Sequence, residues 1–139
     1  SALVARPRQV RASHRPLDPA EVAVLAAAPG ITVGSHTHSH SSLAQLPADE
    51  QRREIAGARH QLERITGTPV TTFAYPFGGR ADLSASTVAI ARDQGVTIAC
   101  AAAPDSVRPA TDPLMVPRII VRNWTAAEFR QRWAEWTAA

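Results

Sequence analysis

Three of the five histidines in the chain, His36, His38 and His40, fall within five residues of one another. They follow residues 31–33, a β-branched Ile-Thr-Val run that predicts a strand. Imidazole is the commonest metal ligand at neutral pH. In a helical turn the first and third histidines share a face, whereas in an extended chain all three do. The triplet predicts a metal site, with a solvated polar loop as the alternative.

Two histidines do not complete a catalytic metal site, which needs about three protein ligands and an open position for water. His38 is a candidate for the third ligand if the backbone is extended. A carboxylate is the other choice: Asp82 follows a glycine turn, and Asp105 and Asp112 lie in a loop rich in proline. The spacing does not select among these four.

A second motif, Phe-Ala-Tyr-Pro-Phe-Gly, spans residues 73–78. Proline presets a turn, and glycine lets the backbone approach a ligand closely. A backbone N–H presented by such a turn can stabilise an oxyanion. Alone the motif indicates an ordinary turn, and its weight comes from its occurrence together with the histidines.

Helical and strand patterns alternate along the chain. Asp18 and Glu21 form a capping box that opens a helix to about residue 28, and Gly67 ends the longest helical pattern. A second capping box, Thr125 with Glu128, opens the last helix. Alternation of this kind is typical of an α/β fold with parallel strands, whose active-site groups gather at the carboxyl ends of the strands. The expected helices are 18–28, 47–65, 84–94 and 125–136, and the expected strands are 31–33, 70–74, 96–100 and 119–121.

The last helix carries Phe129, Trp133 and Trp136 at spacings of four and three. Such an aromatic stripe favours core packing over a cofactor site. Four short strands make a thin sheet for an independent α/β domain. We therefore expect a section of a barrel or doubly wound fold whose beginning is missing.

The histidine segment Gly34 to His40 resembles the His-Ser/Thr-x-x-His motif of the polysaccharide deacetylases, the NodB-homology group of carbohydrate esterases. Residues 73–78 resemble the next loop of that family, and residues 67–70 and 114–119 are also similar. The resemblance covers roughly residue 17 to the end. It implies an incomplete, deformed (β/α) barrel with parallel strands. It also implies two parts of the chain: a basic lead segment over residues 1–17 and a partial deacetylase domain over residues 18–139.

The resemblance also implies an activity, the removal of N-acetyl or alternatively O-acetyl groups from a polysaccharide or glycan. The implied cofactor is a divalent metal, with zinc the expected ion. His36 and His40 match the metal-binding histidines of the family, and the backbone N–H of Phe77 matches its oxyanion donor. The resemblance assigns the remaining residues to the substrate-binding loop (Tyr75, Pro76 and Gly78) and to support of the metal ligands (His38 and Arg118).

The chain departs from the family pattern at one decisive point. The family begins with an Asp-Asp strand that supplies the general base and the third metal ligand, and this sequence has no Asp-Asp pair. Its first residue is Ser1 rather than Met, so we expect a fragment without the first strand and without a catalytic base. A general base contributes roughly 10²–10⁴-fold to rate. We therefore expect weak or no activity, with a non-catalytic metal- and glycan-binding module as the alternative.

The charge pattern bears on the partners. The net charge is +3, and all 15 basic residues are arginine. Nucleic-acid binding through the basic lead segment would require aromatic side chains for stacking, and none precedes Phe73. We expect a glycan partner and no nucleic acid. The sequence has no apolar run of about 20 residues, so we expect no membrane span, and we identify no signal peptide in this stretch. The family resemblance suggests the cell envelope or secretion, but the location stays open.

The missing first strand leaves an unpaired edge on the expected sheet. We therefore expect self-association through this exposed sheet edge.

Overall fold

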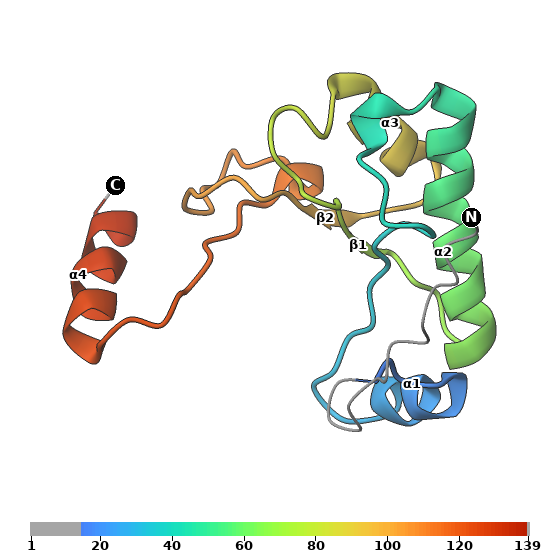
Figure 1. The fold of residues 1–139 in the computed structure, drawn as a ribbon, viewed down its shortest axis with the longest axis horizontal. Helices are drawn as coiled ribbons and strands as arrows, with labels where there is room; N and C mark the ends of the chain where they lie inside the picture. The colour runs from blue at the N-terminus through green and yellow to red at the C-terminus, as the bar shows by residue number, and fades with distance from the viewer. Residues whose placement is uncertain (1–14, 139) are drawn as a thin grey trace, which may run out of the picture.

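A computed structural model describes residues 15–138 and contains a small parallel sheet flanked by helices (Figure 1). Strand β1 (Thr72–Ala74) pairs in parallel with β2 (Ile98–Cys100). Isolated parallel bridges join Ser35 to β1 and Val116 to β2. Four parallel segments therefore lie side by side in chain order. The predicted α/β class with parallel strands is confirmed.

Within residues 15–138, four α-helices accompany the sheet, and local sequence signals fix several of their ends. The capping boxes of Asp18 with Glu21 and of Thr125 with Glu128 both form. Gly67, at a φ of 69°, ends the longest helix in the left-handed conformation that favours glycine. The helices are α1 (Pro19–Ala26), α2 (Ala48–Thr66), α3 (Ala85–Asp93) and α4 (Ala126–Thr137), and the short 3-10 helices are η2 (Leu43–Gln45) and η3 (Pro113–Met115).

The core lies on one face of the sheet. Phe73 of β1 and Ala99 of β2 are buried together with Ile55 of α2 and Ile90 of α3. Successive strand residues point to opposite faces, and Ile98 on the other face is 48% exposed. One face of the sheet is therefore covered by helices, while the other lies open.

Two of the four predicted strands are wrong, and the other two are shorter than expected. Residues 31–33 form no strand, and the pairing there is the single bridge at Ser35. Residues 119–121 also form no strand, and Ile120 and Val121 are 68% and 58% exposed. The β-branched composition is suitable, but a strand exists only where a neighbour accepts its hydrogen bonds. The described chain offers that neighbour at Val116 instead.

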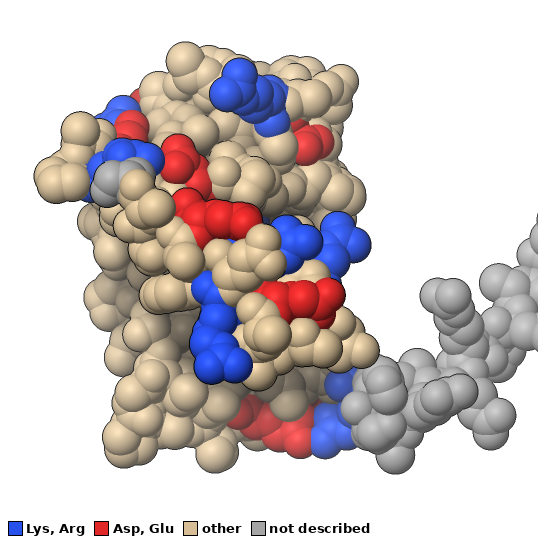
Figure 2. All heavy atoms as spheres, turned by 90° about the vertical axis from the view of Figure 1, so that its left-hand side faces the viewer, with Lys and Arg blue, Asp and Glu red and all other residues tan. Residues whose placement is uncertain are grey.

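The prediction that the last helix packs its aromatic stripe into the core is wrong. No residue of α4 is buried, and Trp133 is 56% exposed. In Figure 1, α4 lies across the molecule from α2, beyond the sheet. Within α4 the rings of Phe129 and Trp133 have centroids 6.0 Å apart. The ring of Trp136 contacts that of Trp124, which precedes the helix, with centroids 5.9 Å apart. Figure 2 shows basic and acidic side chains interspersed on this side of the molecule.

The predicted lead segment 1–17 lies outside the described residues except for its last three. Within it, Arg15 forms an ion pair with Glu21 of α1. Among residues 15–138, no helix is long and apolar enough to cross a membrane.

Candidate active site

The side chains of His36 and His40 face each other in the loop that follows the Ser35 bridge. Their rings meet edge to face with centroids 4.8 Å apart. His36 Nδ1 lies 2.6 Å from the carbonyl oxygen of Ala74, at the end of β1. A carbonyl oxygen only accepts hydrogen bonds, so Nδ1 carries the proton and Nε2 keeps a free lone pair. That is the usual arrangement of a histidine prepared to bind a metal ion.

The backbone between the two histidines is turned by unusual conformations. Thr37 and His40 both have a φ of 62°, in the left-handed region that non-glycine residues rarely adopt. The Thr37 side-chain oxygen accepts a hydrogen bond of 3.0 Å from the His40 N–H. Each such conformation costs about 1–3 kcal/mol and persists only where the surroundings impose it. The turn brings His40 back beside His36.

Gly34 permits the approach of this loop to β1. A Cβ atom at this position would lie 2.8 Å from Thr72 Oγ1 and 3.2 Å from its carbonyl oxygen. The next residue, Ser35, donates its N–H to Thr72 O, and its carbonyl accepts from Ala74 N, both at 2.9 Å. The absence of a side chain at position 34 therefore allows the pairing that carries the histidines to the end of β1.

Glu54 of α2 binds the histidine loop and is a site residue that sequence analysis missed. Its Oε2 accepts hydrogen bonds from the N–H groups of His38 and Ser39, and its Oε1 accepts from Ser39 Oγ. Partial burial raises the pKa of Glu54, but these hydrogen bonds outweigh it and hold the pKa below its ordinary value. No periodicity in the sequence marks this residue, since it appears as one of many charged positions on a long helix.

The Phe77 turn lies directly beside this pair. The Phe77 ring is 59% exposed and meets the His40 ring edge to face at 5.0 Å. Phe77 has a φ of 58°, and its N–H donates to no acceptor among residues 15–138. The next residue, Gly78, is buried at a φ of 68°, and a Cβ atom there would lie 2.7 Å from Ala102 N. The turn therefore leaves the backbone N–H of Phe77 free among the described residues, in the residue whose ring contacts His40.

Tyr75 and Pro76 support the Phe77 turn from the buried side. Tyr75 is 1% exposed and donates its hydroxyl hydrogen to the carbonyl oxygen of Leu114 at 3.1 Å. Burial, together with the negative charge of Asp112, raises the pKa of Tyr75 to about 12. The side chain of Pro76 is also fully buried. Between residues 73 and 78 only Phe77 presents a large side chain outward, so Tyr75 and Pro76 support the loop rather than line its surface. Their place in a substrate-binding loop stays a prediction.

The carboxylates considered as third metal ligand do not join the histidine pair. Among the residues that the structure describes, no group of three His, Cys, Asp or Glu side chains could hold a metal ion. Asp82 instead accepts hydrogen bonds from Ser42 Oγ and Gly79 N, and so links the two loops of the site. Asp112 caps η3, and Asp105 accepts from Ser106 N.

His38 and Arg118, the two residues predicted to support the metal ligands, lie apart from each other. His38 points toward α2, where it lines a small cavity with Gln61 and Leu62. Arg118 donates from Nε to the carbonyl oxygen of Ala101 at 3.0 Å, beyond the end of β2. Their supporting role stays a prediction.

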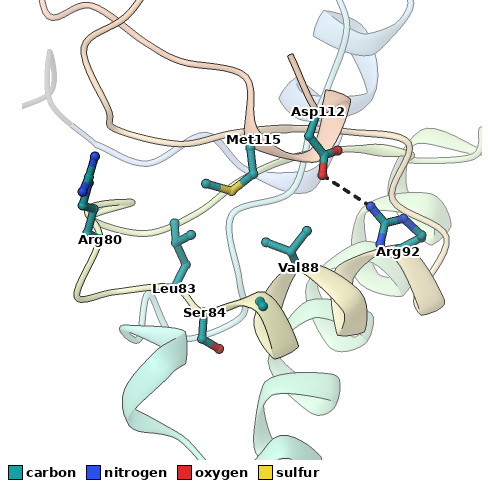
Figure 3. Close-up of a pocket in the computed structure, with 8 residues that line it drawn as sticks. Arg80, Leu83, Ser84, Val88, Arg92, Asp112 and Met115 are labelled. Carbon is teal, nitrogen blue, oxygen red and sulfur yellow. Dashed lines mark ion pairs between the residues drawn. The ribbon is translucent and has the colours of Figure 1, made fainter. Parts of the chain in front are cut away.

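A cavity of about 470 Å³ lies along α3, separate from the histidines (Figure 3). Leu83, Val88 and Met115 form its apolar wall. Arg92 and Asp112 form an ion pair of 3.5 Å at one end, and Arg80 lies at the other. Nothing in its lining resembles a metal or nucleophile site, so the candidate site is placed at the histidine pair.

The histidine pair fits a divalent metal as two of its ligands. Each offers an imidazole, the commonest metal-binding side chain at neutral pH, and the two rings are in contact. The Nδ1 bond of His36 to Ala74 supplies the outer partner that such ligands normally have.

Comparisons with known proteins identify the fold. The deacetylase PplD from Streptococcus pyogenes, solved in complex with acetate, superposes with a TM-score of 0.66 at 23% identity, covering 73% of this chain and 44% of that one. A polysaccharide deacetylase from Bacillus cereus gives 0.70 at 25% identity, with 83% and 36% covered. IcaB from Ammonifex degensii gives 0.70 at 24% identity, with 93% and 56% covered. The chain therefore spans about half, or less, of the structures that it matches.

The parallel segments, with the histidine loop at their carboxyl ends, match a section of a (β/α) barrel. A family model for polysaccharide deacetylases matches residues 8–99. The chain belongs to the polysaccharide deacetylase family, and the predicted fold, an incomplete barrel of the NodB-homology type, is confirmed. No curated protein sequence matches the chain.

Proposed function

We propose that this chain carries part of the active site of a metal-dependent deacetylase, which removes N-acetyl or alternatively O-acetyl groups from a glycan. The observation that carries the proposal is the pair of imidazoles, with ring centroids 4.8 Å apart, and the contact of the Phe77 ring with His40. The N–H of Phe77 has no acceptor among residues 15–138. His36 and His40 are the metal ligands, and zinc is the expected ion. The family membership of the chain supports the class of substrate.

Each group has a defined task in acetyl hydrolysis. A bound divalent ion polarises the acetyl carbonyl and makes a water molecule more acidic. The N–H of Phe77 donates to the oxygen that becomes negative, and loss of one such donor typically costs about 10²–10³-fold in rate. The carbonyl of Ala74 fixes the tautomer of His36, so that Nε2 stays free for the metal. The buried Tyr75 and Pro76 hold the turn that presents Phe77.

The same residues support low activity for this chain by itself. No carboxylate among residues 15–138 completes a three-ligand metal group with the histidines. A general base is worth about 10²–10⁴-fold in rate, and none is assigned in this chain. We therefore propose that the chain binds the metal weakly and releases acetate slowly.

Zinc binding by the chain tests the ligand assignment. Calorimetry should detect one Zn²⁺ site, and His36→Ala and His40→Ala should each weaken it by about 100-fold or more, beyond the cost of losing a supporting partner. His60→Ala is the matched control, because His60 is an exposed histidine of α2 that contacts Arg59. Equal affinity in all four proteins would contradict the assignment.

Acetate release tests the activity separately. An oligomer of N-acetylglucosamine incubated with the chain and Zn²⁺ should yield acetate slowly, and the His36→Ala variant should yield none. Rapid release by the chain would refute the expected low activity. A glycan-dependent rise in melting temperature with no acetate would favour the non-catalytic binding module.

A further inference from the structure

Glu54 holds the histidine loop from the outside with both of its carboxylate oxygens. Its Oε2 accepts from the N–H of His38 at 2.9 Å and from the N–H of Ser39 at 2.8 Å. Its Oε1 accepts from Ser39 Oγ at 2.8 Å. Hydrogen bonds to an ionised acceptor are roughly twice as strong as neutral ones. One side chain of α2 therefore makes three strong contacts with two consecutive residues of the loop.

These contacts fall where the loop most needs support. His38 and Ser39 lie between Thr37 and His40, the two residues with a φ of 62°. Left-handed conformations at non-glycine residues persist only where neighbouring groups impose them. Two successive N–H groups that converge on one carboxylate impose the direction of the backbone between them. The orientation of His40 therefore depends on the contact with Glu54.

The helix that carries Glu54 is a rigid support. Its neighbour Ile55 is completely buried, and Ala58, one turn further along, is 7% exposed. Among residues 15–138, no arginine forms an ion pair with Glu54. The carboxylate is thus held by a packed helix, and its hydrogen-bonding capacity is directed to the loop.

We propose that Glu54 is a positioning residue of the metal site, which holds residues 37–40 so that the imidazoles of His36 and His40 keep their edge-to-face contact. Glu54 does not itself bind the metal. The proposal rests on the proposed function for the ligand roles of the two histidines, but the geometry it explains is independent of the metal.

Two variants of Glu54 and one matched control test this role. Glu54→Ala removes all three contacts, whereas the side-chain carbonyl of Glu54→Gln still accepts from both N–H groups without the charge. Glu50→Ala is the control, since Glu50 is exposed on the first turn of the same helix and pairs only weakly with Arg53, at 3.8 Å. Three measurements are made on the whole chain: hydrogen exchange of the His38 and Ser39 amides, NMR signals of the two imidazoles, and Zn²⁺ affinity.

The expected pattern is graded. Glu54→Ala should speed exchange of the two amides at least about tenfold, shift both imidazole signals and weaken Zn²⁺ binding roughly 10- to 100-fold. Glu54→Gln should recover most of the affinity, with a loss below about tenfold, and Glu50→Ala should behave as the unaltered chain. If Glu54→Ala unfolds, Glu54→Gln decides the role by amide exchange: loss of the charge weakens the hydrogen bonds, so the His38 and Ser39 amides should exchange faster than in the unaltered chain, and unchanged exchange would overturn the proposal.

Three results would overturn the proposal. The first is unchanged amide exchange and unchanged imidazole signals in both Glu54 variants. The second is faster exchange with an unchanged affinity for Zn²⁺, which would make Glu54 a support for the loop but not for the ligands. The third is an equal loss of affinity in Glu50→Ala. If the unaltered chain binds no Zn²⁺, the proposed function fails, while the exchange and the imidazole signals still decide the role of Glu54.

Discussion

His36 Nδ1 and the carbonyl oxygen of Ala74 lie 2.6 Å apart, although 38 residues separate them in the sequence. The contact joins the two motifs of the site, because Ala74 ends β1 and leads into the Phe77 turn. It also fixes which nitrogen of His36 carries the proton. The hydrogen bond therefore sets both the position of the His36 ring and the tautomer that the proposed ligand role requires.

The tautomer of His36 is the first prediction. In the metal-free chain at a pH where the ring is neutral, ¹⁵N NMR should show the proton on Nδ1, because the carbonyl of Ala74 can only accept. His38 is the comparison, because its backbone N–H binds Glu54 but its ring forms no hydrogen bond among residues 15–138. A His36 ring protonated on Nε2 would contradict the geometry and would remove the free lone pair that the proposed function needs.

Gly34 supplies the second prediction. Gly34→Ala places a methyl group 2.8 Å from Thr72 Oγ1, so the loop must move away from β1. We expect a loss of about 1–3 kcal/mol in the free energy of unfolding, the usual cost of overpacking, together with weaker Zn²⁺ binding. Chemical denaturation and calorimetry measure the two effects.

Gly57→Ala is the control for that substitution. Gly57 lies within α2, and a Cβ atom there would meet no neighbouring group of residues 15–138 within 4 Å. The same change should therefore stabilise the chain by roughly 0.5–1 kcal/mol, because alanine loses less conformational freedom than glycine within a helix. Equal effects of the two substitutions would show that the contact between Gly34 and Thr72 is unimportant.

Tyr75 supplies the third prediction, a loss of stability at high pH. Its pKa is raised to about 12 in the folded chain, against about 10 when unfolded. Between these values the unfolded chain binds fewer protons, so the free energy of unfolding falls as pH rises, by about 1.4 kcal/mol per pH unit. The contribution is fully present below pH 10 and is lost by about pH 12. Denaturation at pH 8–11.5 measures it.

The composition makes this prediction unusually specific. Tyr75 is the only tyrosine, and every one of the 15 basic residues is arginine, which stays charged at these pH values. Tyr75→Phe should lose about 1 kcal/mol at neutral pH with the hydrogen bond to Leu114, but should show little further loss above pH 10. A parallel decline in both proteins would show that Tyr75 is not the group responsible.

Self-association is the fourth prediction. One face of the sheet is open, with Ile98 48% exposed, and unpaired strand edges favour contact with another chain. We expect light scattering to give a mass that rises with concentration. Ile98→Lys should lower that mass, whereas Ala89→Lys, at an exposed position of α3, should not. A compact monomer at all concentrations, with cooperative unfolding, would count against the prediction.

Sequence alone determined the features that depend only on residues close together in the chain. The capping box of Asp18 with Glu21 and the left-handed Gly67 form within a few residues of the helix ends that they define. The histidine motif and the Phe77 turn were likewise recognisable, since each is a contiguous segment. Such signals are short-range, so they require no knowledge of what packs against them.

Tertiary structure alone decided where strands form and which side chains are covered. Residues 119–121 are as β-branched as a strand, yet they remain unpaired among the described residues, and the aromatic stripe of α4 lies outside the core. The contact of Glu54 with Ser39 spans 15 residues and follows no sequence pattern. Strand pairing, burial and hydrogen bonds of this kind depend on partners distant in the chain, and the fold must bring those partners together before any of them can be identified.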